Sequence, residues 1–271
     1  MIKRPTGSLA AVAIAGIAWT SSADAAGVVA VDQCATLSTP NTVYRLTQSL
    51  ETCGDCLVLA GNRITVDMQN FTIAGNCSSS TGSGITDSGI PLQLTVVKNG
   101  TVTGFEFGVN LAASSRTSVL SVTATFNGNV GIWVGGQGRV QSSMANNNGF
   151  GIIVDDRGQV GQCTAVGNTA VGILASDNCL VTMNTANDND EGIVTGGNCT
   201  VSYNTAKGNS DDGINAGAEG GASNSLVTRN TATGNGDVDF NIGCPSEVTN
   251  NSSSGNSYSF DGAGCHTHNN K

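Results

Sequence analysis

The chain has 271 residues, of which 37 are glycine, 29 are asparagine and only 4 are proline, and charged residues make up 11%. Disordered proteins combine high charge with low hydrophobicity, and collagen has glycine at every third position, so this composition excludes both. The many Gly, Asn, Thr and Ser residues are weak helix formers and disfavour a helical bundle, which leaves a β-protein with many tight turns.

Residues 1–25 have the pattern of a secretory signal peptide. Two basic residues, Lys3 and Arg4, precede the apolar run Leu9–Trp19, and an Ala-x-Ala cleavage motif follows at Ala23–Ala25. The apolar run is too short to cross a bilayer. We therefore predict that residues 1–25 are removed and that the protein is exported to the periplasm or the exterior.

The exported chain would be acidic, with nine basic and 19 acidic residues and a net charge of −10. Such a surface repels nucleic acids and anionic lipid surfaces, so we expect no nucleic-acid partner and no membrane insertion. An acidic polysaccharide would need a local basic patch, and Lys and Arg are scattered along the sequence. We expect a monomer.

Residues 26–271 are predicted to form one domain, because no linker-like composition divides them. Residues 26–60 are expected to cap the N-terminal end, where a stack of strands would otherwise expose unpaired edges. Apolar and β-branched runs predict the next strands. These are Ile64–Met68, Phe71–Ile73, Leu94–Val97, Gly100–Gly104 and Phe107–Leu111.

Internal repetition dominates the rest of the chain. A Gly-Ile pair recurs every 20 or 21 residues, beginning at residues 131, 151, 172, 192 and 213. A column of valines accompanies it, each followed eight residues later by an asparagine. The valines are Val119, Val140, Val160, Val181, Val201, Val227 and Val248, and the asparagines are Asn127, Asn148, Asn168, Asn189, Asn209, Asn235 and Asn256. A second asparagine column, three residues after the valines, comprises Asn184, Asn204, Asn230 and Asn251.

The repeat predicts an all-β fold, a single-stranded parallel β-helix with 20 or 21 residues per coil. Each unit has only short β-type segments that cannot bury a face alone, so successive units must stack. Stacking about 4.8 Å apart places the valines above one another in the core. It also lets asparagine amides at the turns hydrogen-bond along the axis. Residues from about 257 to 271 are expected to form a C-terminal tail.

Two kinds of segment resemble known proteins. The run Ile64–Gly75, followed by Lys98–Phe105, is similar to exported right-handed parallel β-helix proteins of the pectate-lyase-like superfamily. The later Asn-x-Ala-x-x-Asn units with their Gly-Ile pairs resemble β-helix repeats of carbohydrate-binding proteins and sugar hydrolases. The resemblance implies a right-handed solenoid, in agreement with the general preference for right-handed crossovers. It does not define an activity, because this superfamily has many activities.

Nine cysteines in an exported chain predict disulfide bonds. Cysteines one coil apart would face each other at a distance that a disulfide accepts, although reduced cysteines could also stack as small apolar residues. The spacing predicts the pairs Cys179–Cys199, Cys244–Cys265 and Cys56–Cys77, with Cys34 reaching Cys53 inside the cap. Cys163 is left over and is expected to be buried and inert.

Acidic residues gather before two successive Gly-Ile pairs, Asp190 and Glu191 before one and Asp211 and Asp212 before the next. Stacked coils would bring these like charges close together, which is unfavourable unless solvent screens them or a cation bridges them. The four residues are therefore candidate Ca²⁺ ligands, or an acid and base for glycoside hydrolysis. The alternative is a solvated turn.

A second candidate group consists of Asp156, Arg157 and Asp177. An arginine beside carboxylates could clamp a uronic acid, and the alternative is an exposed ion pair between Arg157 and Asp177. An insertion in the repeat, residues 217–224, contains Glu219 and is expected to form a loop near the acidic residues, because such insertions often lie on the binding face.

The known catalytic motifs of β-helix enzymes are incomplete in this chain. Asp211-Asp212-Gly213 is similar to the paired aspartates of polygalacturonases, but their Gly-His-Gly and Arg-Ile-Lys motifs are absent, so no catalytic residue is assigned. His266 and His268 are interpreted as part of a frayed polar tail rather than as metal ligands.

We therefore predict non-catalytic binding of carbohydrate or another surface polymer along one face of the solenoid. One alternative is a polysaccharide lyase or glycoside hydrolase that uses the stacked acidic residues, with Ca²⁺ as a candidate cofactor. A second alternative is a structural or adhesive surface protein.

Overall fold

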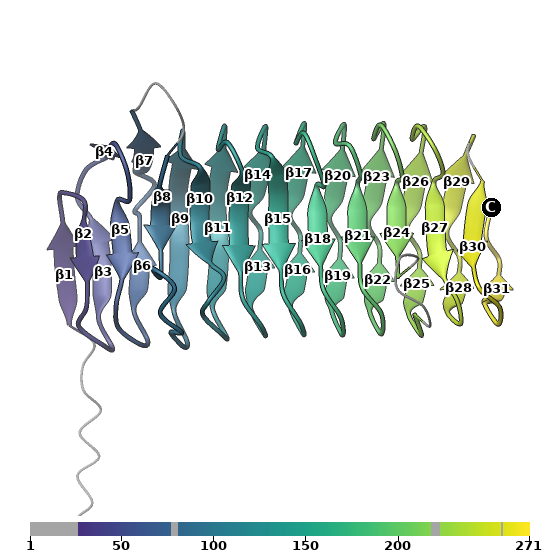
Figure 1. The fold of residues 1–271 in the computed structure, drawn as a ribbon, viewed down its shortest axis with the longest axis horizontal. Helices are drawn as coiled ribbons and strands as arrows, with labels where there is room; N and C mark the ends of the chain where they lie inside the picture. The colour runs from purple at the N-terminus through teal and green to yellow at the C-terminus, as the bar shows by residue number, and fades with distance from the viewer. Residues whose placement is uncertain (1–26, 77–80, 218–222, 256) are drawn as a thin grey trace, which may run out of the picture.

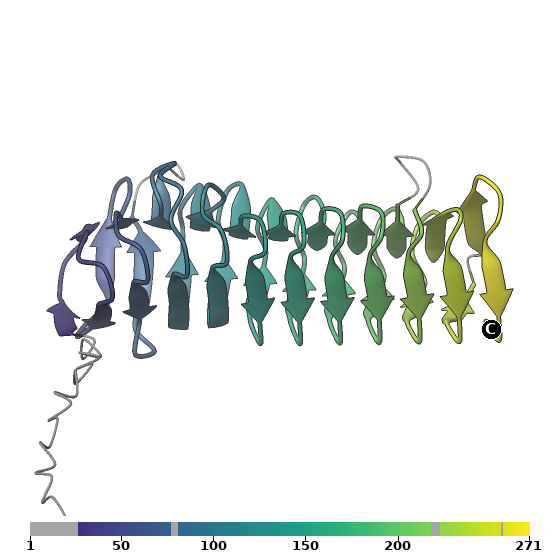
Figure 2. The same cartoon turned by 90° about the horizontal axis from the view of Figure 1, so that it is seen from below.

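The computed structural model describes residues 27–76, 81–217, 223–255 and 257–271, which form an elongated solenoid of parallel strands (Figure 1). Two sheets run along the solenoid, and Figure 2 shows them as opposite walls. In these ranges the chain contains no helix, and thus none that could cross a membrane.

The 11-stranded sheet takes one strand from each coil. Its strands are β2 (Ala35–Leu37), β5 (Leu57–Leu59), β8 (Ser83–Thr86), β10 (Phe107–Leu111), β12 (Val130–Val134), β15 (Phe150–Val154), β18 (Ile173–Ala175), β21 (Ile193–Thr195), β24 (Ile214–Ala216), β27 (Phe240–Gly243) and β30 (Tyr258–Asp261).

The 20-stranded sheet forms the other wall. Its strands are β1 (Val28–Val31), β3 (Val43–Leu46), β4 (Leu50–Thr52), β6 (Thr65–Asp67), β7 (Thr72–Gly75), β9 (Val96–Thr103), β11 (Ser118–Thr125), β13 (Arg139–Gln141), β14 (Met144–Asn146), β16 (Gln159–Gly161), β17 (Thr164–Val166), β19 (Leu180–Thr182), β20 (Thr185–Asn187), β22 (Thr200–Ser202), β23 (Thr205–Lys207), β25 (Leu226–Thr228), β26 (Thr231–Thr233), β28 (Glu247–Thr249), β29 (Ser252–Ser254) and β31 (His266–His268).

A bend divides this second wall, so that most coils contribute two short strands to it. The residue at the bend has a positive φ, as in Met183 (58°) and Tyr203 (58°). The earlier strands β9 and β11 are eight residues long and run through the bend. The predicted strands Leu94–Val97 and Gly100–Gly104 are therefore parts of one strand.

The predicted valine column forms the core of this wall. Parallel pairing places Val119 beside Val140 and continues coil by coil to Val248. All seven valines are at most 1% exposed, so the column and the parallel β-helix are confirmed. Burial of these stacked apolar side chains is the main favourable term in folding.

The described members of the two asparagine columns form hydrogen-bonded ladders, as predicted, and they lie inside the solenoid, whereas Asn256 lies outside the described residues. In the first ladder, the side-chain oxygen of Asn189 accepts bonds from the side-chain and backbone N–H groups of Asn168, both at 2.9 Å. The side-chain nitrogen of Asn189 donates to the carbonyl of Ala165 at 3.1 Å. Each buried amide thus satisfies backbone groups that the turn leaves without a strand partner.

The described ends of the chain continue the solenoid. Strands β1 to β5, in the segment predicted as a cap, already pair in parallel with the next coil. At the other end, β31 pairs with β28, so the interpretation of His266 and His268 as part of a frayed tail is wrong. The backbone hydrogen bonds of this pairing hold the segment in the last coil.

Disulfide bonds link neighbouring coils, and the predicted pairs Cys179–Cys199 and Cys244–Cys265 are confirmed. The predicted pairings of Cys34 with Cys53 and of Cys56 with Cys77 are wrong, because Cys34 pairs with Cys56. These two cysteines directly precede the paired strands β2 and β5, which brings their Cα atoms to 4.4 Å. Cys53 is also disulfide-bonded. Cys77 lies outside the described residues.

Candidate functional site

Two rows of turns border the sheets and hold the predicted site residues. We call the turns from the 11-stranded into the 20-stranded sheet the leading edge, as at 155–158 and 176–179. The turns back to the 11-stranded sheet, as at 188–192 and 208–213, are the trailing edge. In Figure 1 the trailing edge is at the top and the leading edge at the bottom. The predicted acidic residues lie on the trailing edge, and Asp156, Arg157 and Asp177 lie on the leading edge.

The trailing edge brings three carboxylates together. Backbone N–H groups of Asp211 and Asp237 donate to the carbonyls of Asp190 and Asp211, so these three residues follow one another on successive coils. Oxygens of Asp211, Asp212 and Asp237 lie within 4.8 Å of one another, and we call these residues the acidic cluster. The structure thus joins predicted Asp211 and Asp212 to Asp237 and places Asp190 one coil away.

Electrostatics in the acidic cluster disfavour the ionised form of Asp211. Partial burial of Asp211, with the negative charges of Asp212, Asp237 and Asp190, raises the pKa of its carboxyl above the ordinary value. Asp212 is buried, and its two oxygens accept bonds from the Asn241 side chain (2.9 Å) and the Val238 backbone N–H (3.4 Å). Protonation or a bound cation would both relieve the repulsion.

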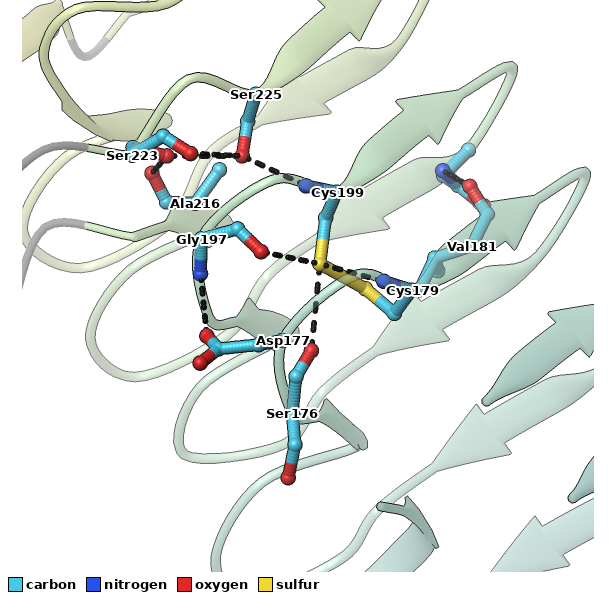
Figure 3. The surroundings of a disulfide bond; sticks show 10 residues. Ser176, Asp177, Cys179, Val181, Gly197, Cys199, Ala216, Ser223 and Ser225 are labelled. Atoms are coloured by element: carbon cyan, nitrogen blue, oxygen red, sulfur yellow. Dashed lines mark hydrogen bonds between the residues drawn. A yellow bond between two sulfur atoms is a disulfide. The ribbon is translucent and has the colours of Figure 1, made fainter. Parts of the chain in front are cut away.

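On the leading edge the predicted group forms no charged clamp. Arg157 and Asp177 are both described and form no ion pair, so that alternative is wrong. Instead, the Arg157 backbone N–H donates to the Asp177 carbonyl (2.9 Å). The Asp177 side chain accepts the Gly197 N–H at 2.7 Å, beside the Cys179–Cys199 disulfide (Figure 3). The carboxylate is held by this turn rather than by the arginine.

The insertion begins at Gly217, directly after β24, whereas Asp212 lies just before that strand. The described residues at the two ends of the insertion, 217 and 223–224, are therefore on the leading edge. For these residues, the expectation that the insertion lies beside the acidic residues is wrong. Glu219 lies outside the described residues.

Basic residues that are far apart in the sequence lie together on the outer face of the 20-stranded sheet. Arg45, Lys98, Arg139 and Lys207 stand on its strands, and Arg229 stands at the bend between β25 and β26. Between Val96 and Thr233, none of the described strands of this sheet contains Asp or Glu. Acidic residues of these coils lie in the turns instead. We call this surface the basic face.

Partners of these cations are few on the basic face. Lys98 pairs with the buried Asp67 at 3.4 Å, which neutralises it. The guanidinium of Arg229 lies 5.4 Å from the ring centre of Tyr203 and donates to its hydroxyl at 2.8 Å. Arg139 donates to Gln141 on the same strand. The contacts of Arg229 and Arg139 are thus with a tyrosine and a glutamine, neither of which neutralises the positive charge of the arginine.

A shallow groove of about 170 Å³ lies on the basic face where β13, β16 and β19 run side by side. Gly161 has no side chain between Gln141 and Thr182, which creates the hollow. The remaining lining residues are Arg139, Gln159, Val160, Gln162, Leu180 and Met183. The groove thus offers amides, a guanidinium and apolar surface, and no carboxylate.

No protein-family model matches the sequence, and no curated protein is significantly similar to it. Solved structures do resemble it. Pectate lyase Pel9A matches with a TM-score of 0.57 and 18% identity, over 86% of this chain and 71% of the other. The A-module of mannuronan C-5 epimerase AlgE6 from Azotobacter vinelandii matches with a TM-score of 0.55 and 16% identity, over 87% and 83%.

A third structure, the Dettilon tailspike protein, matches with a TM-score of 0.65 and 13% identity, over 78% of this chain and 48% of the other. Identities this low demonstrate a common fold and nothing finer. The chain therefore has the fold of the right-handed parallel β-helix proteins.

Proposed function

We propose that the protein binds an anionic polysaccharide along the basic face without cleaving it. The observation that carries this proposal is the segregation of charge. Exposed Arg139, Lys207 and Arg229 share a face whose strands from Val96 to Thr233 lack acidic residues, in a chain of net charge −9. A local positive field attracts an anionic chain even when the whole molecule is acidic. Two of the similar structures are named for the polysaccharides pectate and mannuronan.

The geometry of the basic face suits a polymer better than a single sugar. Arg139 and Arg229 are four coils apart along the axis, or about 19 Å at the usual strand spacing. Solenoids present such extended binding surfaces. The glutamine amides of the groove both donate and accept hydrogen bonds, which matches the capacity of sugar hydroxyls.

The groove also argues against catalysis on the basic face. Glycoside hydrolysis uses two carboxyl groups on either side of the scissile bond. The groove lining contains glutamines in place of Asp or Glu. A polymer held there would meet binding groups but no acid and base pair.

Affinity electrophoresis of the purified protein tests the proposal. Gels would contain polygalacturonate, alginate or the neutral polymer dextran. We expect retardation by an anionic polymer, none by dextran, and no new reducing or unsaturated ends after prolonged incubation. Retardation by dextran alone, or release of cleavage products, would overturn the proposal in its present form.

A second candidate function is Ca²⁺ binding at the acidic cluster, which the proximity of its three carboxylates favours. Ca²⁺ takes six to eight oxygen ligands, and carboxylates are the usual charged ones. Glu191 and Asp190 would be additional ligands by our sequence-based hypothesis. Calcium titration calorimetry of the wild type and of an Asp211→Asn/Asp212→Asn variant tests this, and binding that survives in the variant would exclude the cluster.

We also propose export directed by residues 1–25, which lie outside the described residues. The disulfides between described coils support it, because such bonds persist in oxidising compartments. N-terminal sequencing of protein recovered from the medium or periplasm should begin at Ala26. A sequence that begins at Met1 would contradict cleavage.

A further inference from the structure

The two histidines of the chain, His266 and His268, share strand β31 in the last coil. Side chains two residues apart on a strand point to the same side. Thr267 between them is in register with the buried Val248, so it points to the core side of the last coil, where it is itself exposed. Both imidazoles therefore point outward, and both are exposed.

A carboxylate stands beside this histidine pair. The parallel pairing of β31 with β28 places Glu247 in register with His266, so the two side chains rise from neighbouring strands about 4.8 Å apart. Glu247 is also exposed. Two imidazoles and one carboxylate thus share one small outer surface at the end of the solenoid.

The backbone under these side chains is fixed. Cys265, directly before His266, is joined by a disulfide to Cys244 of the preceding coil, with 5.0 Å between their Cα atoms. The His266 N–H donates to the Ser246 carbonyl at 2.9 Å, and the His268 carbonyl accepts from Asn250 at 3.0 Å. Side chains on a fixed strand converge on an ion at lower entropic cost than side chains on a loop.

We propose that His266, His268 and Glu247 bind one divalent transition-metal ion per chain, with Zn²⁺ as the reference ion. Imidazole nitrogens and a carboxylate oxygen are preferred zinc ligands, and water completes the coordination. Among the described residues, the acidic cluster is the group of three or more possible ligands whose atoms already lie within 4.8 Å of one another. Metal binding at β31 therefore requires the exposed side chains of His266, His268 and Glu247 to rotate toward one another.

This ligand set differs from the other candidate metal ligands of the chain. The acidic cluster offers only oxygens, which suit Ca²⁺, whereas imidazoles select ions such as Zn²⁺, Cu²⁺ and Ni²⁺. Among described cysteines, the free thiol of Cys163 is buried and the others form disulfides. Thiolates therefore do not compete for zinc in the folded protein.

Titration calorimetry with Zn²⁺ on the full exported chain tests the proposal. We expect one ion per chain, at least tenfold weaker binding in His266→Ala and in His268→Ala, and a smaller loss in Glu247→Gln. Two controls should leave the zinc affinity unchanged: Thr267→Val, on the opposite side of the same strand, and Asp32→Asn, an exposed carboxylate at the other end of the solenoid. Circular dichroism would verify that each variant is folded.

A measurement on the wild type alone complements the variants. The electron paramagnetic resonance spectrum of the Cu²⁺-loaded protein should show coupling to two imidazole nitrogens. The proposal would be overturned if the wild type showed no saturable Zn²⁺ binding or bound only half an ion per chain. It would also be overturned if the His266→Ala/His268→Ala variant kept the zinc affinity of the wild type, or if the copper spectrum showed no coupling to nitrogen.

Discussion

Buried asparagines satisfy the backbone at each turn, and this gives a prediction for Asn189. Asn189→Ala would leave the backbone N–H of Asn168 and the carbonyl of Ala165 without partners inside the solenoid. Each buried unsatisfied group costs about 1–3 kcal/mol, so for the two groups we expect the free energy of unfolding to fall by about 2–6 kcal/mol. Urea denaturation measures this change.

The control is Asn187→Ala, two residues away on the outer surface. Its side chain accepts a bond from the exposed Lys207 N–H, which water can replace. The expected loss is below about 1 kcal/mol. Equal losses in the two variants would contradict a specific role for the ladder.

Cys163 occupies a position in the second asparagine column. Its backbone N–H donates to the Asn184 side chain at 2.9 Å, as an asparagine would there. Burial raises the pKa of the thiol to about 11, so the reactive thiolate is scarce at neutral pH. We expect no reaction with a disulfide reagent at pH 8 until the protein is unfolded in urea. Rapid modification of the native protein would contradict this burial.

The acidic cluster should make stability depend on pH. A carboxyl whose pKa is higher in the folded than in the unfolded state destabilises the fold once it ionises, and this penalty disappears below the unfolded pKa of about 3.9. The raised pKa of Asp211 therefore predicts that Asp211→Asn increases the urea midpoint at pH 7 and not at pH 3. The control is Asp32→Asn, an exposed residue, which should change the urea midpoint at neither pH. If Asp211→Asn changed the midpoint by the same amount at pH 7 and pH 3, an electrostatic cause would be excluded.

At the scale of the elements, the coil is the repeating unit of structure, because each strand pairs with its equivalent one coil away. Deletion of residues 140–159 would join Arg139 to Val160 and keep the valine, alanine and asparagine columns in register. We expect this variant to fold with a cooperative thermal transition, since stability of such proteins is roughly a sum over neighbouring repeats.

A matched deletion tests the importance of the register. Deletion of residues 140–154 removes fewer residues but joins Arg139, on strand β13, to Asp155, in the turn after β15. The inward and outward positions of the joined coil then no longer match those of the neighbouring coils. We expect this variant to be insoluble or unfolded by circular dichroism. If both deletions behaved alike, the columns would not determine the fold.

The spacing of the residue columns made the stacking of the strands predictable from the sequence. The start and end of individual strands were harder to predict. Short coils with strict repeats, such as those around Val140 and Val160, were assigned correctly. The disulfide of Cys34 was not, because the N-terminal coils repeat less regularly and spacing alone could not identify which strand follows each cysteine. The continuity of β9 was also missed, because Asn99 has a positive φ, yet the strand runs through this residue instead of ending there.

At the scale of the whole molecule, the coiling separates charges that are mixed along the chain. Arg139 and Arg229 are 90 positions apart in the sequence, yet they share the basic face, while Asp156 and Asp211 lie on opposite edges. The proximity of Asp211 and Asp212 to Asp190 could be predicted because neighbouring repeats carry acidic residues at the same position, whereas Asp237 was not among the predicted ligands. The basic face could not, since its residues occupy different columns and only their common outward direction unites them.

The most direct test of binding by the basic face is the dissociation constant for polygalacturonate of the wild type, Arg139→Gln/Arg229→Gln and Lys271→Gln, measured at low and high salt. Exposed charge pairs contribute up to about 1 kcal/mol each, so the double variant should bind about tenfold more weakly at low salt. The difference should shrink at high salt because ions screen the charges. Lys271→Gln, outside the basic face, should match the wild type. Equal affinity of the double variant and the wild type at low salt would contradict the proposal.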